Sequence, residues 1–453
     1  MGGYDVIVVG AGTGGTMAAK TAAKAGLKVL LVDKKPKDRI GDKVCGDAIG
    51  RHHFDNLGLS YPKGDELESV FEGIEVYSPD LETVFRIKGE KLEGFGVNRY
   101  LFGQRLLKEA LDAGAELKDN TNVVKPIVKE NFVKGVVVKS GNEIKEIEAN
   151  IVIDASGVSG VIRKRLTSEF GVEKEILRED LIVAYREIRE LKEPDENPNY
   201  AKIYLTQNIA PGGYYWIFPK KNGTIVNVGI GVQSGVNAPN PKKQLYKYVL
   251  NKGLFRDSKI IHSGGGAVPT RRPLDCLTAN GVMFVGDAAF QVNPVHGGGI
   301  GPSMIAGKIA GEVAMEALEK GDVSREGLWD YNVRFMKEYG AKQAGLDIFR
   351  WFLQKLSDDE LNWGMKHKLV TEQDVLRANL GEDLKLNITE KAVRFFRGIR
   401  RLSFLQKLKE VANTMKKVKR LYRNYPIPKK FEKWKNEVNK IFTEFKRKHE
   451  GNR

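Results

Sequence analysis

The first 33 residues alternate between short apolar runs and a stretch of small residues, which predicts a strand–helix–strand unit. Residues 6–9 are four consecutive Val and Ile side chains, a pattern typical of a buried parallel strand. Residues 16–24 are rich in Ala and favour a helix, and Gly26 stands where a helix C-cap is expected. Residues 29–32 predict a second strand that ends at Asp33. The chain therefore begins like an α/β fold with a parallel sheet.

The rest of the chain predicts further strands, followed by helices. Strands are expected at residues 73–85, 133–138, 151–157 and 281–287, and helices at residues 99–113 and 297–318. Segments that cluster or alternate like antiparallel strands lie at residues 181–185, 202–205, 214–218 and 224–232. The strand at 281–287 is expected to return to the first sheet. From Leu328 onward the pattern is helical, with few strand signals.

Three glycines mark the turn between the first predicted strand and its helix. Gly10, Gly12 and Gly15 form the pattern G-x-G-x-x-G. In this pattern the first glycine permits a tight turn, the second lets a pyrophosphate approach the backbone, and the third lets the helix pack closely on the strand. The helix N-terminus offers free N–H groups to the phosphates, and Asp33 is placed to accept both hydroxyls of an adenosine ribose. The sequence therefore predicts a dinucleotide site, and this motif alone fits NAD and FAD equally.

A second glycine-rich element, far along the chain, favours FAD. The predicted strand before Asp287 places that carboxylate where the ribityl chain of a flavin passes. The glycine run that starts at Gly297 then opens a helix whose backbone amides can approach the isoalloxazine and the pyrophosphate. Nicotinamide dehydrogenases do not need this element. Because the two glycine regions lie far apart in the sequence, insertions must interrupt the FAD-binding domain.

The predicted fold class is α/β, with an interrupted Rossmann-type FAD-binding domain, an antiparallel-sheet substrate domain and a helical C-terminal region. The FAD-binding domain is expected at residues 1–75, 95–175 and 260–327. The substrate domain is expected at residues 76–94 and 176–259, and the helical region at residues 328–453.

The net charge of +16 is concentrated at the C-terminal end of the chain. Residues 401–453 carry 17 Lys and Arg against 5 Asp and Glu, a net of +12 that leaves about +4 for the other 400 residues. A basic tail on a nearly neutral body argues against nucleic-acid binding and favours contact with an anionic surface. Residues 402–421 can form an amphipathic helix, and Phe431, Trp434 and Phe442 add aromatic groups typical of membrane interfaces. Two outcomes stay open: peripheral contact with an anionic membrane, or packing of the apolar stripe against the protein body.

The two cysteines, Cys45 and Cys276, exclude a disulfide framework and Cys-x-x-Cys metal clusters, so no metal is expected. Cys276 is assigned a structural role. The first residues lack the basic segment of a signal peptide, and no apolar run approaches the roughly 18 residues that a spanning helix needs. We therefore expect a cytoplasmic protein that either stays free or contacts the inner face of the cell membrane.

Three aromatic residues form a stripe on one predicted strand. Tyr214, Trp216 and Phe218 alternate along the chain, so on a strand their rings project from one face and build a long apolar wall. An ordinary sheet core is the alternative, but the glycines at 212–213 and a proline at each end favour the wall of a shaped pocket. Aromatic walls suit isoprenoid chains, which offer only apolar surface and π bonds.

Together these motifs resemble the aromatic-hydroxylase superfamily of flavoproteins and, within it, the geranylgeranyl reductase family. The resemblance covers about residues 1–340 and includes a Cys-Gly pair at 45–46 and a P-x-x-Y-x-W-x-F-P motif at 211–219. It implies FAD, held by Gly10, Gly12, Gly14, Gly15, Asp33, Cys45, Gly46, Arg99, Val123, Asp287, Gly298, Gly299 and Ile300. It implies that Tyr214, Trp216 and Phe218 bind the substrate. The implied reaction is FAD-dependent reduction of C=C bonds in geranylgeranyl chains of archaeal ether lipids.

The sequence departs from the hydroxylase pattern where an Asp-Gly pair serves reduced nicotinamide, because this chain has Ser156-Gly157 there. The electron donor therefore stays open among ferredoxin, reduced nicotinamide and reduced deazaflavin. A flavin monooxygenase or halogenase of the same superfamily is the alternative function.

Two residues are candidates for catalysis. Cys45 lies in the loop expected to reach the flavin ring, although it could instead be a small buried residue. His296 could stabilise charge on a reduced flavin or relay a proton, or its side chain could be satisfied by the loop backbone. The acid that protonates the alkene stays open between Cys45 and a bound water. His52 and His53 are adjacent in the sequence, and the start of a surface helix explains them as well as a functional role does.

Overall fold

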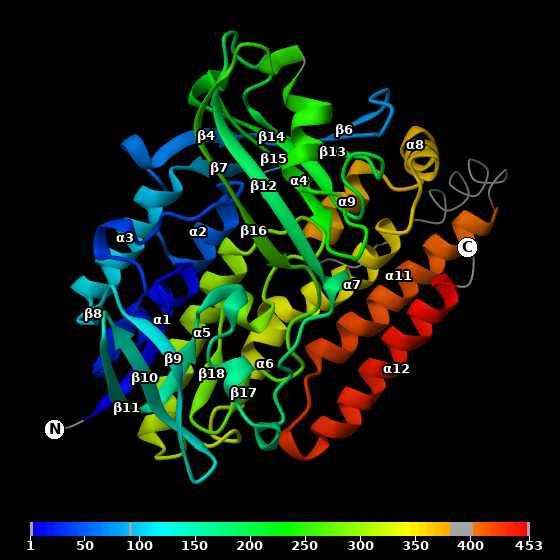
Figure 1. The fold of residues 1–453 in the computed structure, drawn as a ribbon. Coiled ribbons are helices and arrows are strands. Elements are labelled where there is room, and N and C mark those ends of the chain that lie inside the picture. Colours follow the sequence, from blue (N-terminus) through cyan, green and yellow to red (C-terminus); the bar gives the residue numbers. More distant parts are fainter. Residues whose placement is uncertain (1–2, 90–92, 252, 381–401, 451–453) are drawn as a thin grey trace.

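The predicted strand–helix–strand unit lies at the centre of a mostly parallel sheet (Figure 1). The computed structural model describes residues 3–89, 93–251, 253–380 and 402–450. β1 (Tyr4–Val9) pairs in parallel with β2 (Val29–Val32) and β11 (Glu143–Asp154), and the sheet order is β17-β18-β11-β1-β2-β8. The other strands are β8 (Glu116–Lys118), β9 (Asn122–Lys129), β10 (Phe132–Ser140), β17 (Thr278–Ala279) and β18 (Val282–Phe284). Because β18 pairs with β11, the predicted return of the chain to the first sheet is confirmed.

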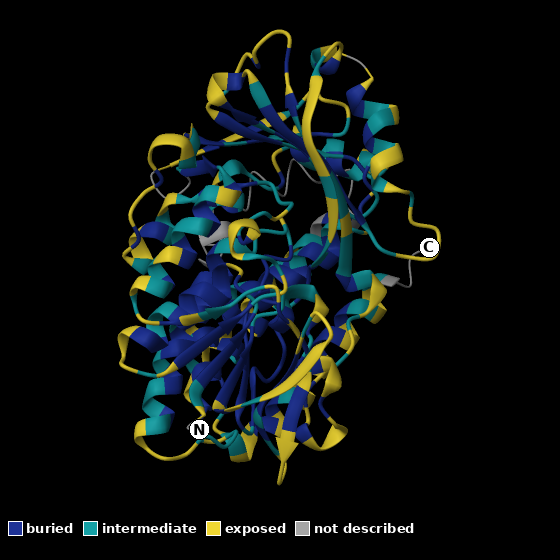
Figure 2. Cartoon of the chain, turned by 60° about the vertical axis from the view of Figure 1, so that its left-hand side comes forward, coloured by how far each residue is buried: buried dark blue, intermediate teal, exposed yellow. Residues whose placement is uncertain are grey.

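Three helices pack around this sheet: α1 (Thr13–Lys24), α3 (Arg99–Asp112) and α5 (Ile300–Glu319). The backbones of α1 and α5 approach each other because glycines lie at their crossing. A Cβ atom at Gly307 would lie 2.1 Å from the Gly14 carbonyl oxygen, and one at Gly14 would lie 3.0 Å from that of Ser303. The strands β1, β2 and β18 and the last residues of β11 are mostly buried and belong to the dark blue core of Figure 2, whereas the first residues of β11 are exposed.

A second sheet of seven strands forms the upper part of the molecule in Figure 1, with the order β16-β12-β15-β14-β13-β5-β6. All its pairings are antiparallel except that of β13 with β5. Its strands are β5 (Gly73–Tyr77), β6 (Val84–Lys88), β12 (Leu181–Glu190), β13 (Tyr200–Leu205), β14 (Tyr214–Lys220), β15 (Ile225–Gln233) and β16 (Lys259–Pro269). The short helix α4 (Pro241–Leu245) packs against β12 and β15.

This pairing moves two of the predicted boundaries. Residues 259–269 belong to the second sheet through β16, whereas the sequence placed residues from 260 onward with the FAD-binding domain. The single strand expected at 73–85 is instead two strands, because Ser78 closes a turn in which its N–H donates to the Thr83 carbonyl. A small third sheet, of β3 (Ala48–Gly50), β4 (Leu67–Phe71) and β7 (Gly94–Val97), and helix α2 (Arg51–Leu57) lie beside α3 and α5.

The C-terminal region is helical, as predicted. It contains α6 (Asp330–Phe335), α7 (Ala341–Leu353), α8 (Asp358–Lys366), α9 (Glu372–Leu380), α11 (Leu402–Arg423) and α12 (Phe431–Glu450). A single π-helical turn, at Met336–Gly340, links α6 to α7. Helices α11 and α12 run side by side along one flank of the molecule (Figure 1).

The apolar stripe of α11 faces the protein body and not the outside. Val411, Met415 and Val418 are at most 9% exposed, because α11 packs along α7. The aromatic residues of α12 that were assigned to a membrane interface, Phe431, Trp434 and Phe442, are also buried. The side chain of Leu405 lies outside the described residues. Of the two outcomes that the sequence left open for this stripe, the structure shows packing against the protein body, which removes the apolar surface from water.

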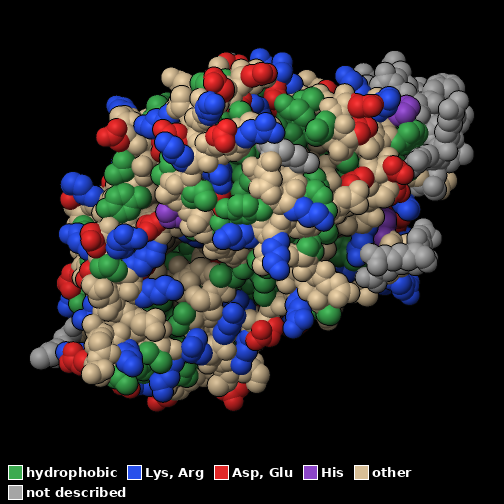
Figure 3. Space-filling model, turned by 45° about the horizontal axis from the view of Figure 1, so that its top comes forward, with side chains coloured by type: hydrophobic (Ala, Val, Ile, Leu, Met, Phe, Trp, Pro, Cys, Tyr) green, Lys and Arg blue, Asp and Glu red, His purple; other side chains and the backbone are tan. Residues whose placement is uncertain are grey.

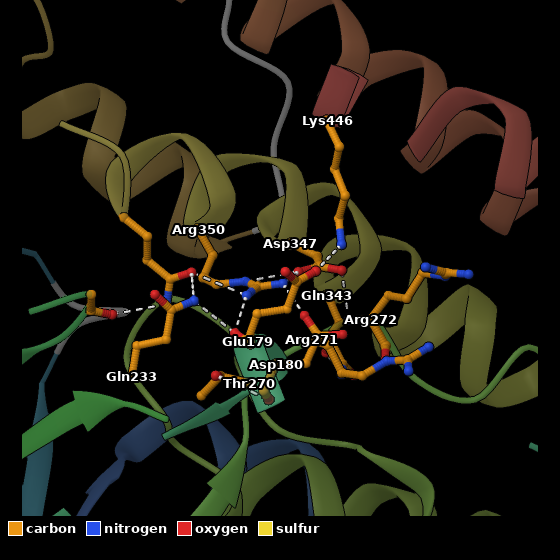
Figure 4. Close-up of polar contacts among 12 residues, drawn as sticks. Glu179, Asp180, Gln233, Thr270, Arg271, Arg272, Gln343, Asp347, Arg350 and Lys446 are labelled. Carbon is orange, nitrogen blue, oxygen red and sulfur yellow. Dashed lines mark hydrogen bonds and ion pairs between the residues drawn. The ribbon is translucent and has the colours of Figure 1, made fainter. Parts of the chain in front are cut away.

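Buried polar contacts fasten the C-terminal helices to the junction between the two sheets (Figure 4). The Arg350 guanidinium in α7 lies 2.7 Å from a carboxylate oxygen of Asp180 and 2.6 Å from one of Asp347. The ammonium group of Lys446 in α12 pairs with Glu179. Burial of a charge is tolerated when it is paired and hydrogen-bonded, so these contacts fix α7 beside the start of β12.

Candidate active site

A single cavity of about 1240 Å³ runs from the first glycine turn to the C-terminal helices. One end is lined by the glycine turn, Asp33 and Arg99, and the middle by the Cys45 loop and residues 293–303. The other end is lined by strands of the second sheet and by α7 and α8. Small-molecule pockets measure roughly 300–1000 Å³, so this cavity has room for a dinucleotide and a second ligand.

The first glycine turn leaves space where a phosphate is expected. No atom lies within 4 Å of the position that a Cβ at Gly12 would take, and Gly12 lines the cavity. Asp33 stabilises this turn, since its carboxylate oxygens accept the N–H groups of Ala11 at 2.7 Å and Lys35 at 2.8 Å. A carboxylate has about four acceptor positions, so Asp33 keeps capacity for ribose hydroxyls.

Unlike Gly12, Gly15 lies in a contact between two elements of the fold. A Cβ there would lie 1.8 Å from the Gly10 carbonyl oxygen, and Gly15 does not line the cavity. Its role is the close packing of α1 on β1 that the sequence predicts. Gly14 lines the cavity but also sits in the contact between α1 and α5.

Arg99 begins α3 and is only 7% exposed. Its Nε and Nη1 atoms have no hydrogen-bond partner in the described part of the chain, although Arg99 lines the cavity. Buried donors without partners are rare in native structures, and a guanidinium is the donor best suited to a diphosphate. Arg99 therefore fits the pyrophosphate of a dinucleotide.

The second glycine element lines the same space. Asp287 follows β18, and its carboxylate faces Lys43 at 3.5 Å. Val123 of β9 also lines the cavity. Gly298, Gly299 and Ile300 also line the cavity, just where α5 begins. Two glycine elements, a carboxylate and a guanidinium with two donor atoms that have no partner among the described residues thus surround one space, and this arrangement fits FAD.

The three aromatic rings share one face, as predicted. The ring centroids of Tyr214 and Trp216 are 6.0 Å apart, those of Trp216 and Phe218 are 6.1 Å apart, and all three line the cavity. The Tyr214 hydroxyl donates to the His296 carbonyl oxygen at 2.6 Å. Phe218 packs against Gly46, where an added Cβ would lie 3.0 Å from the ring. The aromatic wall therefore touches both loops expected to hold the flavin ring.

The loop that carries Cys45 is fixed by buried polar residues that the sequence analysis missed. Asn227 of β15 accepts the Trp216 indole N–H at 3.0 Å and donates to the Cys45 carbonyl at 2.8 Å. The Lys220 ammonium lies 2.9 Å from the Asp47 carboxylate, and both side chains are buried. A Lys directly after the aromatic motif, in an otherwise apolar strand, was the available signal.

The Cys45 side chain is a thiol and not a thiolate. Its Sγ donates to the Asp47 carboxylate at 2.8 Å. Burial, with a smaller contribution from Asp47, raises the pKa of Cys45 to about 12. A group with that pKa keeps its proton at neutral pH, so Cys45 is not an activated nucleophile.

His296 is held in the loop before α5 by backbone contacts. Its Nδ1 accepts the Gly298 N–H at 3.1 Å, and its own N–H donates to the Asn293 side chain at 3.2 Å. This contact places the ring proton on Nε2 when the imidazole is neutral. The His296 ring is thus hydrogen-bonded by the loop backbone and also lines the cavity, so the two alternatives for this residue do not exclude each other.

His52 and His53 lie in the first turn of α2, so the expected start of a helix is confirmed. Both also line the cavity, with ring centroids 4.0 Å apart. His53 packs on the first turn of α5, since a Cβ at Gly301 would lie 2.2 Å from its ring. Burial holds the pKa of His53 well below its usual range, so the ring is neutral.

Ser156, where the sequence departs from the hydroxylase pattern, makes local hydrogen bonds. Its hydroxyl donates to Asp154 at 2.5 Å and accepts the Val161 N–H at 2.8 Å. Asp154 in turn accepts the N–H groups of Ile162 and Arg163, each at 3.0 Å.

The far end of the cavity is mostly apolar, although Gln207, Arg350, Gln354 and Glu360 also line it, and the sequence analysis did not predict it. The C-terminal helical region contributes much of it: Leu346, Phe349, Phe352, Leu353, Leu356, Leu361, Met365, Leu369 and Phe404. Strands of the second sheet face them with Ile74, Val76, Phe85, Ile87, Ile203 and Leu205. The helices at 328–453 are therefore part of the site, whereas the sequence suggested only a separate domain.

Comparison with known proteins places this cavity in a family. The chain matches the family model "Geranylgeranyl reductase catalytic domain" over residues 180–268 and the model "Glucose inhibited division protein A" over residues 5–191. It is 47% identical over 446 residues to the digeranylgeranylglycerophospholipid reductase of Sulfolobus acidocaldarius, and the match covers 98% of each chain. The chain belongs to the digeranylgeranylglycerophospholipid reductase family. The resemblance inferred from the motifs is thereby confirmed.

Solved structures agree with the family assignment. The chain is similar to a geranylgeranyl bacteriochlorophyll reductase-like protein of Thermoplasma acidophilum, with 27% identity, a TM-score of 0.74 and coverage of 90% of this chain and 99% of that one. It shares its fold with a flavin-dependent brominase at 19% identity, a TM-score of 0.63 and coverage of 89% and 99%. The second likeness concerns the fold alone, so it does not support halogenation by this member of the reductase family.

Proposed function

We propose that the protein is an FAD-dependent reductase that saturates C=C bonds of geranylgeranyl chains, in the biosynthesis of archaeal ether phospholipids. One observation carries the proposal. The space that fits FAD and the apolar space lined by the aromatic wall and α7 form one cavity. A long isoprenoid chain in the apolar part can therefore bring its double bonds beside the cofactor part. The family of the chain supports this reaction class.

FAD, when reduced, supplies a hydride to one carbon of the double bond. The cofactor would be held by the glycine turn with Asp33, by Arg99, and by the turn before α5 with Asp287. An isolated alkene has no carbonyl that could stabilise negative charge, so proton transfer to the other carbon must lead or accompany reduction. The positive charge that develops is favoured by the faces of Tyr214, Trp216 and Phe218. The apolar lining also keeps water away from that charge.

Cys45 is the proposed proton donor. Its thiol proton is retained at neutral pH, its Sγ lies in the wall between the two cofactor loops, and Asp47 orients it. The resulting thiolate could regain a proton from solvent only along the cavity. A bound water could protonate the alkene instead of Cys45. Removal of the thiol should lower turnover only if Cys45 itself is the proton donor.

The test is lipid mass spectrometry of cells that make unsaturated archaeal ether lipids and co-express this protein. Each reduced double bond should add two hydrogen atoms to the lipid mass. The protein purified from these cells should be yellow and should release FAD on denaturation. Products that gain oxygen or halogen would favour a monooxygenase or halogenase, and unchanged lipids in the presence of bound FAD would contradict the proposed reaction.

We also propose that the protein contacts anionic membranes through charge alone. The outer faces of α11 and α12 expose many basic side chains, including Lys409, Lys416, Lys417, Arg420, Lys433 and Lys440. Each basic residue close to an anionic leaflet contributes about 1 kcal/mol. No helix among the described residues is long and apolar enough to cross a membrane. On the face in Figure 3 the basic side chains are instead mixed with acidic and apolar ones, in keeping with the nearly balanced body.

A further inference from the structure

A group of basic side chains lies together on one wall of the cavity. Lys342 projects from the first turn of α7, His52 and His53 come from α2, and His296 comes from the loop before α5. All four line the cavity. Lys419 of α11 lies behind this wall and is 5% exposed. Segments far apart in the sequence thus bring five basic groups to one place.

Lys342 and His53 have no acidic side chain beside them in the described part of the chain. Every charge that acts on the pKa of Lys342 or His53 in the described chain is positive. Lys342 makes no ion pair there, and its ammonium group lies 5.2 Å from the centre of the Tyr339 ring. Burial, reinforced by Lys419, lowers the pKa of Lys342 to about 8. A charge that is partly removed from water and has no counter-charge destabilises a fold, so an anionic ligand would complement Lys342 and His53.

His53 adds an unsatisfied polar atom to this wall. Its Nδ1 is buried and has no hydrogen-bond partner in the described part of the chain. The ring cannot turn away freely, because it is packed against Gly301 and against His52. An unpaired buried polar atom in a native structure calls for a partner from outside the chain.

The residues that line the rest of the cavity indicate which class of molecule carries the anionic group. Along the cavity-facing side of α7, Lys342 is followed by Leu346, Phe349 and Leu353. The wall continues into Leu361 and Met365 of α8. Beyond Lys342 the lining from α7 and α8 is mostly apolar, and its charged members are Glu360 and Arg350, which is paired with Asp180 and Asp347. The matching ligand is therefore an amphiphile whose anionic end lies near Lys342.

We propose that Lys342 and His53 form a subsite for the phosphate group of the isoprenoid phospholipid substrate. This inference rests on the proposed function and deepens it. A phosphate has three acceptor oxygens on a compact centre, which suits an ammonium group flanked by imidazoles. The FAD pyrophosphate has its own cationic partner in Arg99, on a different element. The phosphate holds one end of the lipid, and the chain extends along α7 beneath the aromatic wall.

The test compares two saturated ligands that cannot be reduced: a diether glycerol phosphate with isoprenoid chains, and the same diether glycerol without phosphate. Binding of both to the FAD-loaded protein is measured in detergent by calorimetry. The wild type should bind the phosphorylated lipid at least ten-fold more tightly. Lys342→Met should abolish that difference and leave the affinity for the phosphate-free lipid unchanged. Lys337→Met, on the exposed side of the preceding turn, should behave as the wild type.

Inorganic phosphate distinguishes a lipid headgroup from a free anion. It should displace the phosphorylated lipid from the wild type and not from Lys342→Met. Phosphate that binds without displacing the lipid would overturn the headgroup assignment. Equal loss of both lipids in Lys342→Met would overturn it too, since that pattern points to the cofactor or to the fold. Because neither ligand turns over, these outcomes stand apart from whether the protein reduces alkenes.

The melting temperature gives a second, independent readout. Without lipid, Lys342→Met should melt at a higher temperature than the wild type, because the variant removes an unpaired buried charge. Added phosphorylated lipid should raise the melting temperature of the wild type more than that of the variant. A lower melting temperature for the lipid-free variant would show that Lys342 stabilises the fold, and the subsite would be refuted.

Discussion

The two ends of the cavity are built in different ways. The cofactor end is made largely of backbone: glycine turns and helix N-termini, with few side chains such as Asp33 and Arg99. The lipid end is made of side chains from many elements, among them β5, β6, β13, α7 and α8. A backbone surface depends on a few positions that tolerate no side chain, whereas a side-chain surface shares its area among many residues. A single substitution at the cofactor end should therefore abolish FAD binding, whereas a single substitution at the lipid end should weaken lipid binding only in part.

The largest effect is expected at Gly15. In Gly15→Ala the new Cβ would lie 1.8 Å from the Gly10 carbonyl oxygen, so α1 cannot stay on β1 and the protein should fail to fold or to hold FAD. Gly12→Ala is the matched control, because no atom lies within 4 Å of its new Cβ. This variant should fold with an unchanged melting temperature and yet bind FAD weakly, since the methyl group occupies the phosphate position. Flavin absorbance and thermal melting check both, and a Gly12→Ala protein with normal FAD content would break the comparison.

The next effect is expected at Trp216, on the lipid side. Trp216→Ala removes a buried ring that lies against Gly229 and takes the indole donor away from Asn227 Oδ1. It should lower the free energy of unfolding by about 3–5 kcal/mol and weaken binding of long chains more than short ones. Trp216→Phe keeps a ring and loses only the indole hydrogen bond, which costs about 1 kcal/mol. Denaturant unfolding measures the first effect and a chain-length series the second; equal weakening for all lengths would mean that the loss is only one of folding.

The same contrast decides how much could be predicted from the sequence. The glycine turns, Asp33, the strand that returns at Asp287 and the aromatic stripe were all predicted correctly in position, because each is a local pattern with a local cause. Lys342, His53 and the apolar residues of α7 and α8 were not, because their proximity depends on how distant helices pack. The stripe of α11 was left open between two outcomes for the same reason: its periodicity predicts one apolar face, but not the surface that covers this face.

A smaller effect is expected at Cys45, where the two ends meet. Cys45→Ala should retain FAD and reduce turnover by about 100-fold if the thiol is the general acid. Because the pKa of Cys45 is raised to about 12, the wild-type thiol stays protonated as the pH rises from 7 to 10, and turnover should show no loss near the ordinary thiol pKa. Single-turnover reduction, started with chemically reduced FAD, measures the step without a physiological donor. Unchanged turnover in Cys45→Ala would assign the proton to a water.

The smallest effects are expected outside the cavity. Replacing Lys416, Lys417 and Lys433 with Gln should change the free energy of unfolding by no more than about 0.5 kcal/mol, because these side chains are exposed. Binding to anionic vesicles should fall by up to about 1 kcal/mol per residue and should vanish at high salt. Co-sedimentation with neutral vesicles is the control. If wild type and variant sediment alike with anionic vesicles, the basic faces of α11 and α12 only keep the protein in solution.

The pairing of β11 with β18 also has a consequence for how the chain is made. The first sheet cannot be completed until residues 282–284 have left the ribosome, although β1 emerges at the start of synthesis. At roughly 5–20 residues per second, β11 waits with an unpaired edge for on the order of ten seconds. The side of α7 that packs against α11 stays uncovered longer still, until α11 has been synthesised. The nascent chain therefore exposes an unpaired strand edge and apolar surface during much of its synthesis, and such surfaces favour aggregation.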